Sequence, residues 1–256
     1  MHKQKPCIFY DSWIMFKRCM KIALRSPEAL VQATVTPIFL MLLFGAVFGN
    51  ITDVGSYNYV DFIIPGIILQ AVAQATSYIA ININTDMNKG IVDRFRSMPI
   101  SKSALLIGHA GASIIRNVIT TTLIIVTALA IGFRPQADFT DWLIIAGVLL
   151  LSASAITCFA VLCGLKAKTP EGASGLMFPL FILPFISSGF APVDTMHVAI
   201  RWFAEFQPMS PIINAVRALM LGYPAGNDLW IAIAWTVGIS VLTFTFALHR
   251  YRMKSM

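Results

Sequence analysis

The sequence is poor in charged residues and lacks the motifs by which most enzymes hold a metal ion or a nucleotide. Only 12% of its 256 residues are charged. It contains no His-Glu-x-x-His pair and no glycine-rich phosphate loop ending in Gly-Lys-Ser/Thr. Its four histidines and four cysteines show no ligand spacing, and the cysteines predict no disulfide. We therefore expect no catalytic residues, no metal and no cofactor bound by this chain.

Long apolar runs dominate instead, since 57% of the residues are hydrophobic. Each run approaches the ~20 residues that a helix needs to cross ~30 Å of hydrocarbon. Inside lipid the backbone must satisfy its own hydrogen bonds, and continuous rather than alternating runs favour helices over a barrel. The sequence predicts an all-α membrane protein with a single domain, residues 1–256. Its six transmembrane helices are expected at residues 29–48, 62–81, 104–131, 142–162, 173–190 and 229–248.

The formal net charge of +7 is concentrated in alternate polar segments. Lys and Arg gather before the first run, between the second and third, between the fourth and fifth, and after the sixth. Because such residues stay on the cytoplasmic side, both termini are predicted to be cytoplasmic. The basic balance then reflects orientation and anchoring to the lipid bilayer, and we expect no nucleic acid as a partner.

Two further segments are apolar but do not fit a span. Residues 1–28 place Trp13 and Phe16 on one face of a helix with basic residues opposite, which predicts an amphipathic helix in the headgroup layer. Residues 191–228 are too apolar for a solvated loop and are interrupted by Pro208 and Pro211. We expect short re-entrant or interfacial helices there, on the external side before the last span.

Polar side chains form stripes on two of the predicted spans. Gln70, Gln74 and Ser77 share one face of the second span, and Asn117 and Thr120 share one face of the third. Polar stripes in lipid turn toward other helices or toward a water-accessible path. The residues are candidates for a translocation path, and helix–helix hydrogen bonding explains each of them equally well.

The polar segment between the second and third spans, residues 86–102, has the sequence features that most strongly indicate a functional contact. Ile91, Phe95 and Met98 supply apolar contacts among charges of both signs. A short helix of this kind fits a groove on a soluble partner, with apolar residues as anchors. A basic turn attracted to lipid headgroups is the alternative.

The run Gly90–Ser101 resembles the hallmark segment of type-2 ABC export permeases, and more narrowly that of their daunorubicin/doxorubicin-resistance group. A second similar stretch is Phe185–Met196, which continues through residues 207–211 to 217–222. Together with the six spans and the amphipathic start, the resemblance covers nearly the whole chain. One departure is His197, where the family often has proline.

The resemblance implies a bacterial plasma-membrane complex of two permease subunits, identical or sister chains. Each would dock one of two ATPase subunits, which hold the ATP and magnesium. The residues it implies for ATPase coupling are Trp13, Phe16, Met87, Ile91, Asp93, Arg94, Phe95, Arg96 and Met98. The residues it implies for an external gate are Ser187, Ser188, Phe190 and Arg217.

The expected function is that of a permease subunit without enzymatic activity, exporting a hydrophobic or amphiphilic compound such as a drug, antibiotic or lipid-like molecule. Polar but uncharged span faces suit such a cargo. Export of polysaccharide or lipid-linked polymer is an alternative on the same fold. An ion-coupled secondary transporter is an alternative of another class, although the spans lack mid-membrane carboxylates. A protein that only sequesters a toxic amphiphile is a third.

Overall fold

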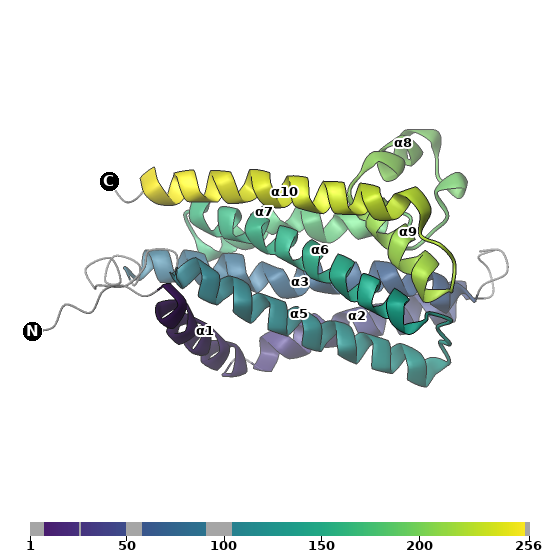
Figure 1. Ribbon diagram of the computed structural model, residues 1–256, viewed down its shortest axis with the longest axis horizontal. Coiled ribbons are helices and arrows are strands. Elements are labelled where there is room, and N and C mark those ends of the chain that lie inside the picture. Colours follow the sequence, from purple (N-terminus) through teal and green to yellow (C-terminus); the bar gives the residue numbers. More distant parts are fainter. Residues whose placement is uncertain (1–7, 26, 50–57, 91–103, 254–256) are drawn as a thin grey trace, which may run out of the picture.

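The computed structural model describes residues 8–25, 27–49, 58–90 and 104–253, and the regular structure in these ranges is helical throughout (Figure 1). The helical class predicted from the sequence is therefore confirmed for this part of the chain. The α-helices are α1 (Ile8–Leu24), α2 (Pro27–Phe48), α3 (Tyr59–Asn88), α5 (Ala104–Ile131), α6 (Phe139–Lys166), α7 (Pro170–Ile182), α8 (Val198–Phe206), α9 (Met209–Met220) and α10 (Gly226–Met253). The 3₁₀ turns are η1 (Leu183–Ile186) and η2 (Val193–Thr195).

The bundle is built around α3, whose apolar stretch is 83% buried. Helices α2, α5, α6 and α7 pack directly against it, α1 lies on α5, and α10 lies on α6 (Figure 1). Burial of α3 explains its sequence, because a central helix is apolar on every side. The outer helices α2 and α10 are each only 17% buried over their apolar stretches.

In the described part of the chain, five helices are long and apolar enough to cross a membrane, namely α2, α3, α5, α6 and α10. The fifth predicted span is shorter than expected, since its α-helix covers 13 residues, or about 20 Å at 1.5 Å per residue. Pro179 lies inside α7, and the chain tightens into η1 just before Pro184. Proline removes a backbone donor and clashes with the preceding turn. The six-span count stays a prediction.

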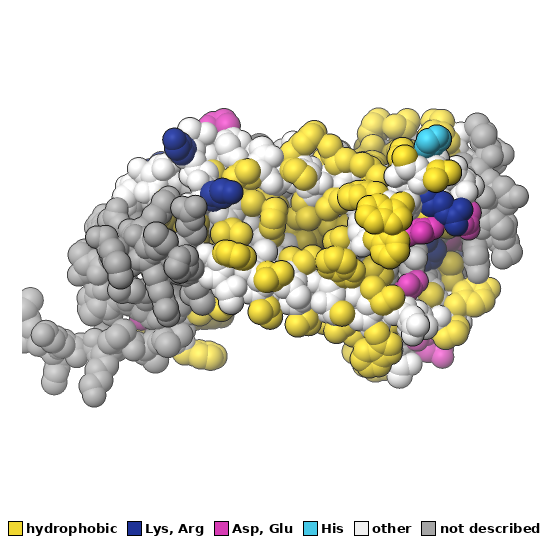
Figure 2. Space-filling view, turned by 90° about the horizontal axis from the view of Figure 1, so that it is seen from above, with side chains coloured by type: hydrophobic (Ala, Val, Ile, Leu, Met, Phe, Trp, Pro, Cys, Tyr) yellow, Lys and Arg dark blue, Asp and Glu magenta, His cyan; other side chains and the backbone are white. Residues whose placement is uncertain are grey.

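The outward faces of the bundle are apolar over its middle. Large side chains on α2, α5 and α10 are exposed, among them Phe39, Val126 and Phe244. In Figure 2 hydrophobic side chains cover the middle of the face shown, and charged side chains lie toward its two ends. Such a surface is far larger than the apolar patches of soluble monomers, and it matches a belt in contact with lipid.

The bundle has two distinct ends, called here the α1 end and the α9 end (Figure 1). Helix α10 ends at the α1 end, so its C-terminal end and helix α1 lie at the same end of the bundle. At the α9 end, η2, α8 and α9 occupy much of the segment 191–228. Short helices were expected in that segment, whereas their depth in the membrane stays a prediction.

Candidate functional site

Helix α1 packs on α5 through a narrow face, and its aromatic side chains are partly exposed beside that contact. A Cβ on Gly108 would lie 2.7 Å from the Cβ of Met15, so only glycine lets the two helices approach this closely. Met15 is buried, whereas Trp13 is 53% exposed and stacks on Phe16 at 5.3 Å. These two predicted coupling residues border an apolar groove of about 370 Å³ between α1 and α5. The interfacial position of α1 stays a prediction.

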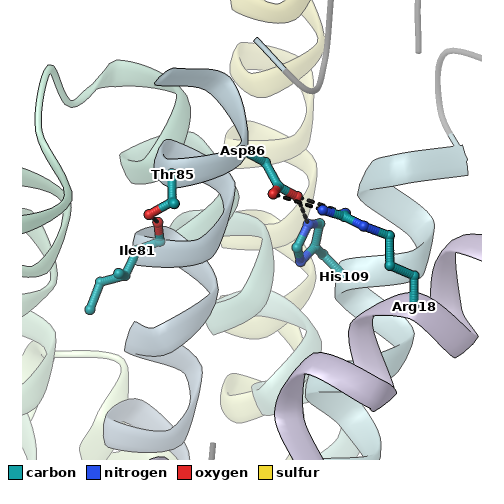
Figure 3. A network of polar contacts seen from close by, with 5 residues as sticks. All are labelled: Arg18, Ile81, Thr85, Asp86 and His109. Atoms are coloured by element: carbon teal, nitrogen blue, oxygen red, sulfur yellow. Dashed lines mark hydrogen bonds and ion pairs between the residues drawn. The ribbon is translucent and has the colours of Figure 1, made fainter. Parts of the chain in front are cut away.

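A buried polar cluster ties α1 to α3 and α5 (Figure 3). The guanidinium of Arg18 donates two hydrogen bonds to the Asp86 carboxylate, at 2.9 and 3.0 Å. His109 Nε2 lies 3.3 Å from Asp86 Oδ2. Hydrogen bonding to Asp86 raises the pKa of Arg18 above its ordinary value. One carboxylate therefore joins three helices, and the bidentate geometry fixes the orientation of α1.

The opposite side of the last turns of α3 is held by two asparagines. Asn84 donates to the carbonyl oxygens of Gly164 and Ala167, at 3.2 and 2.7 Å. Asn88 donates to the carbonyl of Lys168 at 3.1 Å. These carbonyls belong to the end of α6 and its connection to α7, where few backbone donors remain to satisfy them. The end of α3 is thus fixed on both sides.

The predicted coupling segment begins where α3 stops. Met87 lies in the last turn of α3 and packs against the core, so it belongs to this helix rather than to a separate one. Gly90 takes φ +66, a left-handed conformation that favours glycine after a helix. The remaining predicted coupling residues lie outside the described part of the chain; they are Ile91, Asp93, Arg94, Phe95, Arg96 and Met98.

The first candidate path stripe lies on α3 facing α2. Gln70 is fully buried, whereas Gln74 and Ser77 are half-buried. Gln74 donates to the backbone carbonyl of Gln32 in α2 at 3.4 Å. The hydroxyl of Ser77 donates to its own helix at Ala73. In this single chain the stripe is therefore partly accessible and partly an α2–α3 contact.

The second stripe is a buried contact among helices. Asn117 donates to Thr76 Oγ1 in α3 at 3.1 Å, and Ser113 lies 3.0 Å from Thr157 of α6. Thr120 is fully buried. Of the two alternatives that the sequence left open, helix–helix hydrogen bonding describes Asn117. Its role in a path stays a prediction.

The structure brings all four external gate candidates together at the α9 end. Arg217 donates to the carbonyls of Phe62 and Ser188, and its guanidinium lies 3.7 Å from the centroid of the Phe62 ring. The Ser188 hydroxyl donates to Asn214 Oδ1 at 2.7 Å. Ser187 and Phe190 are buried beside them. A dense network of hydrogen bonds therefore joins these residues to α3 and α9; their role as an external gate stays a prediction.

Close backbone contact positions the same network against α3. A Cβ on Gly66 would lie 2.8 Å from the Cα and O of Gly189. Tyr59 donates its hydroxyl hydrogen bond to the carbonyl of Phe190 at 2.9 Å, and Phe190 stacks on Phe185 at 4.7 Å. Two backbones meet here without side chains between them, so α3 and the segment around Gly189 are in direct contact.

Several residues of these sites were missed by the sequence analysis, namely Arg18, Tyr59, Gly66, Asn84, His109 and Asn214. The available signal was the polar run 82–88 at the end of an apolar stretch. Ionisable or amide side chains at a span end indicate partners on neighbouring helices. The identity of those partners depends on which helices pack together, and the sequence does not specify that.

The sequence of the chain matches a known protein family and several named relatives over most of its length. The family model described as ABC-2 type transporter matches residues 10–221. The daunorubicin resistance ABC transporter permease protein DrrB1 of Streptomyces coeruleorubidus is 28% identical over 239 residues, 93% of this chain and 84% of that protein. The probable doxorubicin resistance permease DrrC of Mycobacterium tuberculosis is 27% identical over 217 residues, 83% and 77% of the two chains. The inner membrane transport permease YadH of Escherichia coli is 24% identical over 218 residues, 83% and 82%.

Proposed function

The chain belongs to the ABC-2 type transporter family, and from this we propose that it is the membrane-spanning permease subunit of an ATP-binding-cassette exporter. Its cargo is a hydrophobic or amphiphilic compound, such as a drug, an antibiotic or a lipid-like molecule. The match to permeases named for daunorubicin and doxorubicin resistance over most of the chain is the observation that carries the proposal. The uncharged polar stripes on α3 and α5 support a cargo of this kind.

The proposed complex contains two permease chains, identical or sister, and two ATPase subunits that hold ATP and magnesium. Each permease has six spans, with α7 and η1 as the fifth, in a bacterial plasma membrane. The α1 end is cytoplasmic, because the basic segments lie there. The α9 end is external, and its Arg217 network is the closed external gate.

Coupling in this proposal starts at the segment that follows Gly90. The ATPase binds this segment through Phe95 and the neighbouring arginines. It also contacts the partly exposed aromatic side chains of α1. The Asp86 cluster makes α1 and α3 respond together, since Arg18 reaches across to α3. Closure of the ATPase pair on ATP then moves α3, and α3 acts on the gate through Gly66.

Reconstitution with the cognate ATPase tests the proposal. The permease is expected to co-purify with the ATPase and to stimulate ATP hydrolysis. Phe95→Asp is expected to abolish both while leaving membrane insertion intact, because that residue lies between spans. Phe139→Asp is the matched control, since Phe139 is 79% exposed at the start of α6, toward the other end. Transport that survives without the ATPase but stops when ion gradients are dissipated would refute the proposal.

A further inference from the structure

A cavity of about 330 Å³ lies between α1, α3 and α5 at the α1 end. Among the described residues α1 and α3 make no direct backbone packing contact, so the Arg18–Asp86 ion pair bridges an open space. The rim includes Lys89 and Ile22, which are exposed, and the floor includes the buried Arg116. This cavity is separate from the gate and from the aromatic groove.

The floor of the cavity holds a buried cation that lacks an anion. Arg116 is 6% exposed and lies two turns of α5 beyond His109, about 10 Å further along the helix axis. Its closest hydrogen bond is a long one, 3.5 Å to the carbonyl of Ala75, and its Nε has no partner. Within the described chain no carboxylate lies at ion-pair distance from this guanidinium. Burying a charge without a counter-charge is unfavourable, which points to an anion supplied from outside the chain.

The cavity as a whole carries an excess of positive charge. Its lining includes three basic side chains, those of Arg18, Lys89 and Arg116, against the one carboxylate of Asp86. Both oxygens of Asp86 are already engaged by Arg18, and one of them also faces His109. Lys89 and Arg116 are therefore the cations available to a ligand, one at the rim and one at the floor.

We propose that this cavity binds the phosphate of an anionic phospholipid headgroup. Arg116 holds the phosphate oxygens from below, since arginine presents several donors to such a group. Lys89 follows Ala75, the hydrogen-bond partner of Arg116, by 14 residues of α3, or about 20 Å of helix rise. It therefore adds positive charge at the entrance and does not contact the same phosphate oxygens. A lipid rather than a free ion fits the place, because exposed Ile22 on α1 lines the opening and offers an apolar contact to an acyl chain.

Native mass spectrometry of the purified full chain tests this site by titration with phosphatidylglycerol, phosphatidylcholine or inorganic phosphate. Phosphatidylglycerol is expected to bind with a Kd about tenfold lower than phosphatidylcholine. Losing a charge-assisted hydrogen bond corresponds to tenfold or more in affinity. Arg116→Gln is therefore expected to raise the Kd for phosphatidylglycerol about tenfold, and Arg116→Lys less.

Lys89→Gln, at an exposed position, is expected to raise the same Kd about threefold, and it carries the test if the Arg116 variant does not fold. Arg134→Gln is the matched control, because it removes one positive charge from an exposed position beyond the other end of α5 and is expected to change nothing. Unchanged lipid binding in both cavity variants would overturn the proposal. So would equal affinity for phosphatidylcholine. Displacement of the lipid by inorganic phosphate alone would show a site for a free anion and would overturn the lipid assignment.

Discussion

Replacing Asp86 with Asn tests whether the buried cluster holds α1 on the bundle. Asp86 is 9% exposed and accepts two hydrogen bonds from Arg18 and one contact from His109. The amide of asparagine keeps the shape but removes the negative charge and one acceptor. Arg18 then loses the negative charge of Asp86, and α1 loses its only described ion pair to α3.

The expected cost follows from burial and geometry. Removing one partner of a buried ion pair costs about 3–5 kcal/mol. Arg18 is 27% exposed in its side chain, so water partly replaces the lost carboxylate and the lower end of that range applies. About 3 kcal/mol corresponds to a fall in melting temperature of about 6–12 °C for a chain of this size.

Thermal unfolding of the purified protein measures this change directly. Asp194→Asn is the matched control, because Asp194 pairs with Arg201 at the same 2.9 Å but is 85% exposed. Exposed ion pairs contribute little to stability, so the control is expected to have the same melting temperature as the wild type. Local release of α1 is followed separately by thiol labelling of buried Cys19 in a background without the other cysteines. Wild-type melting and unchanged Cys19 labelling in Asp86→Asn would refute the tether.

Three further substitutions test the α9 end by thermal unfolding. Gly66→Val is expected to lower the free energy of unfolding by about 1–3 kcal/mol, because its Cβ would meet the backbone of Gly189 at 2.8 Å. Gly147→Ala is the control, since a Cβ there has nothing within 4 Å. An equal loss of stability in the control would contradict the role of the contact. Arg217→Leu removes the hydrogen bonds to two backbone carbonyls and is expected to lower the free energy of unfolding by about 2–4 kcal/mol. It is also expected to increase the leak of solute from vesicles, and an unchanged leak would count against the gate. Tyr59→Phe deletes one buried hydrogen bond and is expected to lower the free energy of unfolding by about 0.5–1.5 kcal/mol. An unchanged free energy of unfolding would show that this hydrogen bond does not stabilise the fold.

The long helices and the family were predictable from the sequence because lipid imposes length and composition on a span. The third run was predicted at 104–131, and α5 is Ala104–Ile131. The resemblance drawn from the segments 90–101 and 185–196 is confirmed by the family match over residues 10–221. Hydropathy was less informative at helix ends. Helix α3 extends to Asn88 rather than 81, because polar side chains such as Asn84 find partners on neighbouring helices.

The packing partners were not predictable, because they depend on which helices meet. Arg18 was expected on the solvated face of an amphipathic helix, yet it turns toward Asp86. His109 gave no signal, since a lone histidine in an apolar run shows no spacing with its partners. Arg217 was expected in an external gate from the resemblance; the structure adds that it is half-buried and donates hydrogen bonds to the carbonyls of Phe62 and Ser188.

Helix α3 connects the two ends of the bundle, and in the proposed mechanism it carries a movement at one end to the other. Its 30 residues extend about 45 Å, and about 30 Å of this length separates the Gly66 contact with the segment around Gly189 from the Asp86 cluster. In that mechanism the ATPase acts on α3 where the helix ends, and the Asp86 carboxylate joins α3 to α1. If α1 and α3 move as one body, Asp86→Asn in the reconstituted complex is expected to leave ATPase binding intact and to lower stimulated hydrolysis and transport together. Stimulation at the wild-type level, despite a released α1, would mean that α3 alone carries the coupling and that α1 serves only as an anchor.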